Sequence, residues 1–243
     1  MPALTRRLVA ASISLAVGVA LVGMPQLTTA AAAADGIPTR TVVTSTNFHP
    51  YYGQSYTIRG QVQLATADED GKVTYTPFPK QEVKLQLCTS RCFTNTPTWK
   101  HLAKTTSDDE TGVFRFRRTA WRTHVYRVVF DASKYLGIIG SSAGAILIRA
   151  HRHVPVRLTQ PRPGHFAMSG RAYPFYGGQR IYLMRKSCNT CAFKTVRSQV
   201  TGPKGGYRFA FGTPSKTSLY VVRARSSKGL AVSYSKIAKI IVR

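Results

Sequence analysis

The sequence predicts an all-β protein in which two tandem seven-stranded β-sandwiches follow an N-terminal signal peptide. No stretch of helical length combines apolar residues at three-and-four spacing with capping residues, whereas β-branched and aromatic residues alternate with polar ones throughout. A short stretch also occurs twice, as Gly112–Phe116 and as Gly205–Phe209. In both copies a turn glycine leads into alternating aromatic and basic residues, which is typical of a strand with one buried and one wet face.

The N-terminal residues 1–34 have the pattern of a secretory signal peptide. Arg6 and Arg7 precede an apolar run from Leu8 to Val22, and the tract Ala30–Ala34 offers an Ala-x-Ala cleavage pattern. The run is too short to cross a bilayer comfortably. We therefore exclude residues 1–34 from the fold and expect a secreted or extracellular protein, with the export route, general or twin-arginine, left open.

The first predicted domain spans residues 35–153. Alternating segments place strands near 40–46, 54–64, 82–88, 98–106, 112–118, 123–131 and 143–150. These seven strands are enough for one sandwich. An insertion near Ala65–Thr76 holds Asp68-Glu69-Asp70-Gly71, which we expect at a hairpin tip because Asp-Gly suits a primed turn.

The second predicted domain, residues 154–243, repeats this pattern. Matching positions are separated by 94 residues for Trp99 and Phe193, Tyr126 and Tyr220, and Ile146 and Ile240, and by 93 for Phe116 and Phe209. A spacing this constant indicates a duplicated domain. Only Ala150–Pro155 joins the two copies, so we expect a short linker and a semi-rigid pair of domains.

The two copies share a glycine-ended strand (Gly60, Gly170), an apolar-x-Leu strand, Gly-x-aromatic-x-Phe, Tyr-x-Val and a closing β-branched strand. This pattern resembles the tandem immunoglobulin-like repeats of secreted actinobacterial proteins, and is similar to fibronectin type III and carboxypeptidase regulatory-like modules. The resemblance implies an extracellular binding or spacer role and transfers no catalytic residue. The chain lacks the widely separated cysteine pair of antibody domains.

Four cysteines occur in two local pairs, each just after the apolar-x-Leu strand of its domain. An even number of cysteines in an exported chain predicts disulfides, and the repeat favours Cys88 with Cys92 and Cys188 with Cys191. A four-thiolate zinc site and a redox Cys-x-x-Cys are the alternatives. Zinc would require two loops of separate domains to meet, and a redox pair usually opens a helix.

The aromatic residues fall into two groups. Those at matched repeat positions predict core packing: Trp99, Phe114, Phe116, Tyr126, Phe193, Tyr207, Phe209 and Tyr220. A second group lies in turn-like contexts: Tyr51, Tyr52, Trp121, Tyr173, Phe175 and Tyr176. These either plug the ends of the sandwiches or form an exposed platform on which sugars or bases stack.

The net charge of +26 is unevenly distributed. Residues 154–243 carry 17 Lys and Arg and no carboxylate, whereas residues 35–153 carry 16 against 9 acidic residues. The electrostatic field of this positive charge attracts polyanions. The alternative is that the high charge only keeps the protein soluble. Alternation predicts a cationic sheet face from Arg115, Arg171, Arg180, Arg185, Lys186, Arg208, Arg223, Arg225, Lys236 and Lys239. We rank an anionic cell-wall polymer first as partner, then a membrane surface, then nucleic acid.

The sequence favours a non-enzymatic binding or spacer module, with protein adhesion through loop aromatics as the alternative. A hydrolase would have to use His101, His124 and Asp131, because the second half holds only His165 and no carboxylate. We expect no metal and no cofactor. His151 and His153 read as a solvated linker pair, and Asp68–Gly71 and Asp108–Glu110 as solvated acidic turns.

Overall fold

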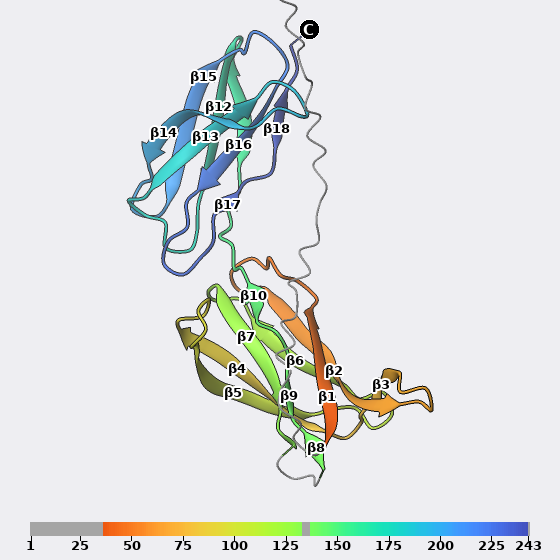
Figure 1. Ribbon diagram of the computed structural model, residues 1–243. Coiled ribbons are helices and arrows are strands. Elements are labelled where there is room, and N and C mark those ends of the chain that lie inside the picture. Colours follow the sequence, from red (N-terminus) through yellow and green to blue (C-terminus); the bar gives the residue numbers. More distant parts are fainter. Residues whose placement is uncertain (1–35, 133–136, 243) are drawn as a thin grey trace, which may run out of the picture. The chain divides into compact units, whose positions relative to one another are not determined.

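The computed structural model describes residues 36–132 and 137–242, and these residues form β-strands without an α-helix (Figure 1). The predicted all-β class is therefore confirmed, whereas the predicted signal peptide lies outside the described residues. In the part of the chain described, nothing helical is long and apolar enough to span a membrane.

In the first half of the chain, the described residues form ten strands. They are β1 (Ile37–Ser45), β2 (Ser55–Ala67), β3 (Val73–Pro77), β4 (Glu82–Ser90), β5 (Thr98–Thr106), β6 (Val113–Thr119), β7 (His124–Phe130), β8 (Ile138–Ile139), β9 (Ser141–Ser142) and β10 (Ile146–Ile148). One sheet has the order β3-β2-β1-β8, with β6 also paired to β2, and the other has the order β10-β7-β4-β5, with β9 also paired to β7. The seven predicted strands are all present, and β3, β8 and β9 are additional.

The acidic insertion is a β-hairpin, as predicted. β3 pairs antiparallel with the end of β2, so that Ala67 lies opposite Val73, and residues 68–72 form the tip. Gly71 has a φ of 75°, and its N–H donates to the Asp68 carbonyl oxygen (3.0 Å). The tip is a five-residue loop rather than the two-residue primed turn that the Asp-Gly pair suggested, because Gly71 is the sole left-handed residue within it.

In the second half, residues 154–242 form eight strands. They are β11 (Arg157–Arg162), β12 (His165–Arg171), β13 (Arg180–Lys186), β14 (Lys194–Val200), β15 (Gly206–Gly212), β16 (Ser218–Ala224), β17 (Ser233–Tyr234) and β18 (Ala238–Ile240). The sheets have the orders β11-β12-β15 and β14-β13-β16-β17, with β18 also paired to β16 (Figure 1). The first half holds the equivalent orders β1-β2-β6 and β5-β4-β7-β10, so each half is an immunoglobulin-like β-sandwich.

The repeated glycine and aromatic residues form one packing device. Gly60 lies opposite Phe114 across β2 and β6, and Gly170 lies opposite Tyr207 across β12 and β15. A Cβ atom at Gly60 would lie 2.0 Å from the Val42 carbonyl oxygen and 2.6 Å from the Phe114 ring. At Gly170 it would lie 2.0 Å from the Pro155 carbonyl oxygen and 2.6 Å from the Tyr207 hydroxyl. A glycine is needed because the aromatic ring covers its backbone.

Each sandwich has its own hydrophobic core. Six of the eight aromatics predicted to be buried are buried: Phe114, Phe116, Tyr126, Tyr207, Phe209 and Tyr220. The prediction is wrong for Trp99 and Phe193, which lie outside both cores on the outer face of a sheet. A period of two separates the faces of a strand but does not tell which face is inside.

Candidate functional site

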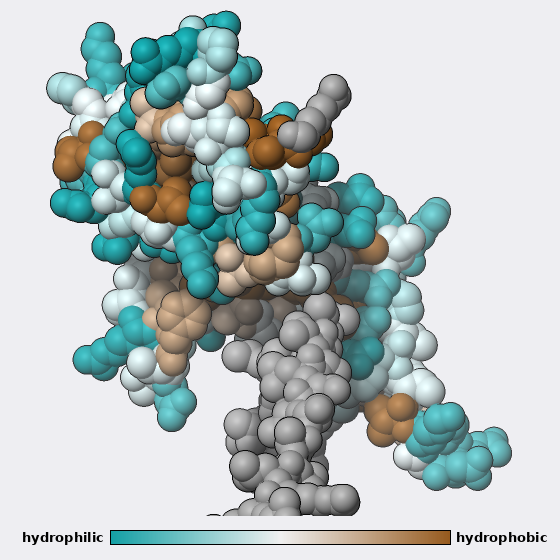
Figure 2. All heavy atoms as spheres, turned by 90° about the horizontal axis from the view of Figure 1, so that it is seen from above, coloured by the Kyte–Doolittle hydropathy of each residue, from teal (hydrophilic) through white to brown (hydrophobic). Residues whose placement is uncertain are grey.

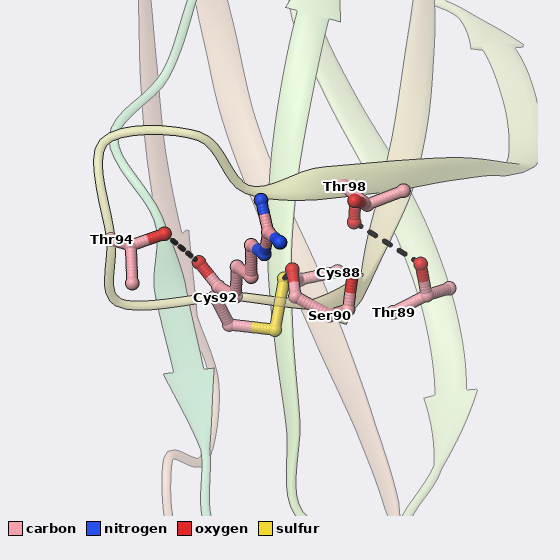
Figure 3. The surroundings of a disulfide bond; sticks show 7 residues. Cys88, Thr89, Ser90, Cys92, Thr94 and Thr98 are labelled. Atoms are coloured by element: carbon pink, nitrogen blue, oxygen red, sulfur yellow. Dashed lines mark hydrogen bonds between the residues drawn. A yellow bond between two sulfur atoms is a disulfide. The ribbon is translucent and has the colours of Figure 1, made fainter.

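The two predicted disulfides are present. Cys88 is bonded to Cys92 and Cys188 to Cys191, and no free cysteine occurs among the described residues. Figure 3 shows the first bridge at the end of β4, where Thr89 donates to the Thr98 carbonyl oxygen (3.3 Å). Disulfides are typical of oxidising, extracellular compartments. With every described cysteine paired, neither the zinc site nor a dithiol pair applies.

The outer face of the sheet β14-β13-β16-β17 carries cations on an apolar layer. Tyr182, Met184 and Val221 form a small cluster on this face, and Phe193 packs against it. The guanidinium carbons of Arg223 and Arg225 lie 5.0 and 4.7 Å from the centre of the Tyr182 ring. The two arginine side chains cover the ring, so that Tyr182 is only 7% exposed.

We name this surface the basic face and define it by Arg180, Lys186, Arg223, Arg225 and Lys239. Arg180 donates to Ser198 on β14 (3.4 Å). Lys186 lies 5.1 Å from the Phe193 ring and donates to the Asn189 carbonyl oxygen (2.7 Å). Lys239 lies opposite Leu219, two residues along the strand from Val221. Figure 2 shows hydrophobic patches set among hydrophilic side chains on the side of the molecule that it presents.

The other predicted cations lie elsewhere. Arg208 is on β15 opposite Ser169, on the second sheet of the same sandwich, and Arg115 is on β6 opposite Arg59. Arg185 lies opposite the core residue Tyr220, at the end of the sandwich rather than on the basic face. Arg171 and Lys236 border two surface hollows that share Tyr173. The structure thus divides the ten predicted residues among several surfaces.

Sequence reasoning missed Tyr182 and Met184, the residues that support the basic face. The signal was present, because Ile181-Tyr182-Leu183-Met184 is an unbroken apolar run. Such a run in a strand indicates that both faces are covered. Here one face packs into the core and the other lies under arginine side chains.

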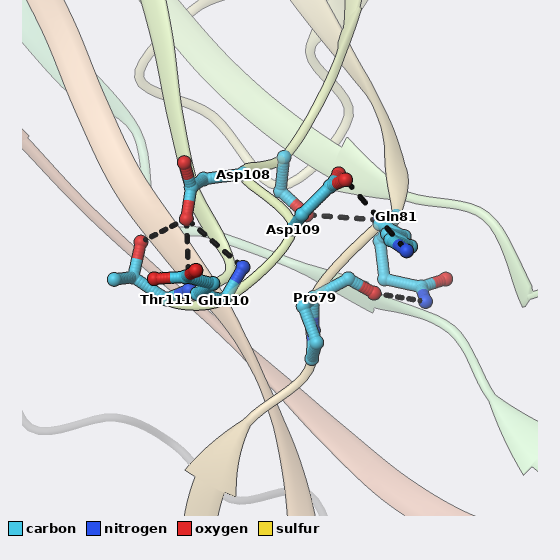
Figure 4. Close-up of polar contacts among 8 residues, drawn as sticks. Pro79, Gln81, Asp108, Asp109, Glu110 and Thr111 are labelled. Carbon is cyan, nitrogen blue, oxygen red and sulfur yellow. Dashed lines mark hydrogen bonds and ion pairs between the residues drawn. The ribbon is translucent and has the colours of Figure 1, made fainter.

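The acidic turn before β6 is held by its own side chains. Oδ1 of Asp108 accepts hydrogen bonds from the N–H groups of Glu110 (3.1 Å) and Thr111 (2.8 Å) and from the Thr111 hydroxyl (2.8 Å) (Figure 4). The Thr111 bonds above all, then the Glu110 bond, lower the pKa of Asp108. Asp109 pairs with Lys80 at 3.6 Å. These contacts indicate a structural turn, and no cluster of three metal-ligating residues occurs in the described ranges.

The three residues named for a hydrolase do not come together. His124 begins β7 and Asp131 follows its last residue, so the two are roughly 23 Å apart at about 3.3 Å per residue. His101 is exposed on β5, and Asp131 pairs with Lys84 (3.0 Å). Burial, followed by the charges of Arg122 and Arg118, lowers the pKa of His124. A catalytic constellation of these three residues is therefore excluded.

The histidines near residue 150 are not a solvated pair, contrary to the prediction. Nδ1 of His151 lies 2.8 Å from the Val232 carbonyl oxygen, and its Nε2 lies 3.2 Å from Nδ1 of His49. Burial lowers the pKa of His151. The His153 ring stacks between Tyr51 (4.9 Å) and Tyr173 (5.1 Å). Both rings are therefore packed against neighbouring groups rather than solvated.

No known protein family and no curated protein matches this chain. Solved structures show distant likenesses. The D0-D1 domain of intimin is 8% identical, with 84% of this chain and 100% of that chain covered and a TM-score of 0.29. A Salmonella alpha-2-macroglobulin reacted with methylamine is 14% identical over 86% and 15% of the two chains, with a TM-score of 0.37. A tetra-tandem repeat from the extending region of a large adhesion protein is 12% identical over 84% and 50%, with a TM-score of 0.31.

This chain thus spans 15% of the alpha-2-macroglobulin and half of the adhesion-protein repeat array. The likenesses are too weak to define a family, and the fold assignment rests on the strand orders themselves.

Proposed function

We propose that the protein is a non-enzymatic extracellular binding module with two domains, residues 35–153 and 154–243, of which the second associates with an anionic cell-wall polymer. The observation that carries the proposal is the basic face. Its five cations lie on one side of one sheet, in a half of the chain that contains no carboxylate. A row of cations on one face neutralises several phosphates at once.

The apolar layer beneath the cations supports this function. Arg223 and Arg225 rest on the Tyr182 ring, which limits the conformations of their side chains before any ligand arrives. Less side-chain entropy is then lost when an anion binds. A solubilising charge needs no such order, because freely moving lysines and arginines serve solubility equally well.

The test measures binding of the protein to poly(glycerol phosphate) over a range of salt concentrations. Three exposed cations of the basic face are replaced together, as Arg180→Gln, Arg225→Gln and Lys239→Gln. The matched control removes three exposed cations of the opposite sheet, as Arg157→Gln, Arg162→Gln and Arg208→Gln.

Loss of three phosphate contacts should reduce the slope of log K against log salt by about 2 and weaken binding roughly tenfold at low salt. The control should change both quantities less. Equal effects of the two triple variants would show that only net charge matters, and unchanged binding by both would remove the polyanion function.

A further inference from the structure

A second surface of the carboxylate-free half presents aromatic rings beside cations. The loop between β12 and β13 places Tyr173 and Phe175 at the surface, 43% and 62% exposed. Together with Arg171 and Lys204 they line a groove of about 530 Å³. Tyr173 also lines a neighbouring hollow of about 410 Å³ that contains Tyr234 and Lys236.

From these features we infer that this groove, which we name the aromatic groove, is a binding site for an acidic oligosaccharide. A pyranose ring would stack on Phe175 or Tyr173, and a carboxylate or phosphate substituent would meet Arg171 or Lys204. The inference is independent of the basic face, because none of the five residues of that face lines this groove.

Phe175 adopts a backbone conformation that a phenylalanine rarely takes. Its φ is 55°, in the left-handed region that disfavours bulky side chains. A strained residue with an exposed apolar ring contributes little to folding, since the ring remains largely in water. Such residues concentrate at ligand-binding sites. Its ring makes one edge contact, 5.9 Å from Tyr52.

The loop that holds these rings is fixed from beneath by Arg152, which has no exposed surface. Its Nε donates to the Pro174 carbonyl oxygen (3.1 Å), its Nη1 to the Arg225 carbonyl oxygen (3.2 Å), and its Nη2 to the backbone and hydroxyl oxygens of Ser227. The guanidinium also lies 4.9 Å from the Tyr176 ring. A buried arginine held by uncharged acceptors serves as a positioning residue for the groove.

Two close backbone approaches complete the support. A Cβ atom at Gly177 would lie 1.9 Å from the Pro203 carbonyl oxygen, and one at Gly205 would lie 2.2 Å from that of Ala172. The loop residues 172–178 therefore lie directly against residues 203–205. Tyr173 exchanges two backbone hydrogen bonds with His153, both 3.0 Å, and stacks on its ring. These contacts position the groove residues without a ligand, which favours binding.

The cations of the groove are also placed. Nε of Arg171 donates to the Lys204 carbonyl oxygen at 2.7 Å, which joins the two sides of the groove. Since residues 154–243 contain no carboxylate, no acidic side chain of this sandwich competes for the guanidinium. A ligand with an acidic group complements this charge better than a neutral sugar or an apolar peptide does.

Calorimetric titration of the protein with tetragalacturonic acid and with its neutral methyl ester tests the inference. The acid should bind more tightly than the ester, and Phe175→Ala should weaken both at least about fivefold, the effect of removing one stacking ring. Arg171→Met should reduce the affinity for the acid to that for the ester. The control is Phe93→Ala, which removes a 78% exposed ring on another loop and should change neither the affinity for the acid nor that for the ester.

Phe175→Gly separates a ligand-binding role from a packing role. Glycine relieves the left-handed strain, so the variant should melt no lower than the parent and still lose binding. A lower melting temperature would show that Phe175 is there for packing, which overturns the inference. Absence of binding by both sugars also overturns it. If the parent protein then still bound isolated cell walls and the Phe175→Ala variant did not, a protein partner would be indicated. Neither result affects the polyanion test, in which Phe175 is not altered.

Discussion

In the first sandwich, cations of the sheet β5-β4-β7-β10 lie beside acidic or polar side chains, whereas the equivalent sheet of the second sandwich has no carboxylate of its own beside its cations. Lys84 pairs with Asp131 at 3.0 Å and Lys104 with Glu82 at 3.3 Å. Arg127 covers Trp99 at 4.5 Å and donates to Gln86 (2.7 Å). In the second sandwich Arg223 and Arg225 cover Tyr182, and residues 154–243 contain no acidic side chain to pair with them.

The comparison shows that one strand order supports two kinds of surface. Both outer faces place a partly buried aromatic ring under a cation, close in sequence to a disulfide, so this arrangement is common to the two halves. The absence of acidic residues distinguishes the second half from the first. Function is therefore expected where the two halves differ, and stability where they agree.

The largest expected effect concerns the glycine that packs against an aromatic ring in each sandwich. Gly60→Ala and Gly170→Ala each force a Cβ atom to within 2.0 Å of a backbone carbonyl oxygen. We expect each to lower the free energy of unfolding by about 3 kcal/mol or more, since neither backbone can move freely. Urea unfolding of the two variants checks this, and a large difference between their effects would contradict equivalent packing.

Substitution of the buried Arg152 should destabilise the second half more than the first. Among the described residues, the side chain of Arg152 hydrogen-bonds to the second half alone, at Pro174, Arg225 and Ser227. Arg152→Met keeps the bulk but leaves these carbonyl oxygens without donors, and we expect a loss of about 3 kcal/mol. Hydrogen exchange should increase in β13 and β16 more than in β4 and β7. A uniform increase would contradict a local role.

The disulfides should matter less. Each closes a loop of only a few residues, with sequence separations of 4 and 3, for which chain entropy gives about 2 kcal/mol at most. Cys88 is buried and Cys188 is exposed, so the double variant Cys88→Ser/Cys92→Ser should lose more stability than Cys188→Ser/Cys191→Ser. Thermal melting of both variants measures the difference, and the reverse order would be evidence against it.

The smallest expected effect concerns two buried tyrosine hydroxyls, one in each half. Tyr56 donates to the Tyr126 hydroxyl (3.0 Å) and Tyr207 to the Pro155 carbonyl oxygen (2.6 Å), and burial raises the pKa of both above its usual value. A raised folded-state pKa means that the stability contribution is complete below a pH of about 10 and is lost above it.

Tyr56→Phe and Tyr207→Phe should each cost about 1 kcal/mol at neutral pH. Each should also reduce the loss of stability in alkaline solution, because one fewer buried hydroxyl can ionise. Denaturant unfolding from pH 7 to pH 11 provides the measurement. An unchanged alkaline slope in both variants would exclude these tyrosines as its cause.

The sequence by itself determined much of the fold. Alternation at a period of two gave the strands, the constant offset of 94 between Tyr126 and Tyr220 gave the duplication, and the local spacing of Cys88 and Cys92 gave the bridge. These signals succeed because each depends on neighbours along the chain or on an exact repeat.

Only the tertiary structure decided which face of a strand lies inside and which distant residues meet. It placed Trp99 and Phe193 outside both cores and gathered Arg223 and Arg225 over Tyr182. It also buried Arg152, whose partners lie 22 to 75 positions away in the chain. A period of two is the same for both faces of a sheet, so it does not identify the buried face. Contacts between separate loops leave no periodic pattern in the sequence, so only the tertiary structure shows which loops meet.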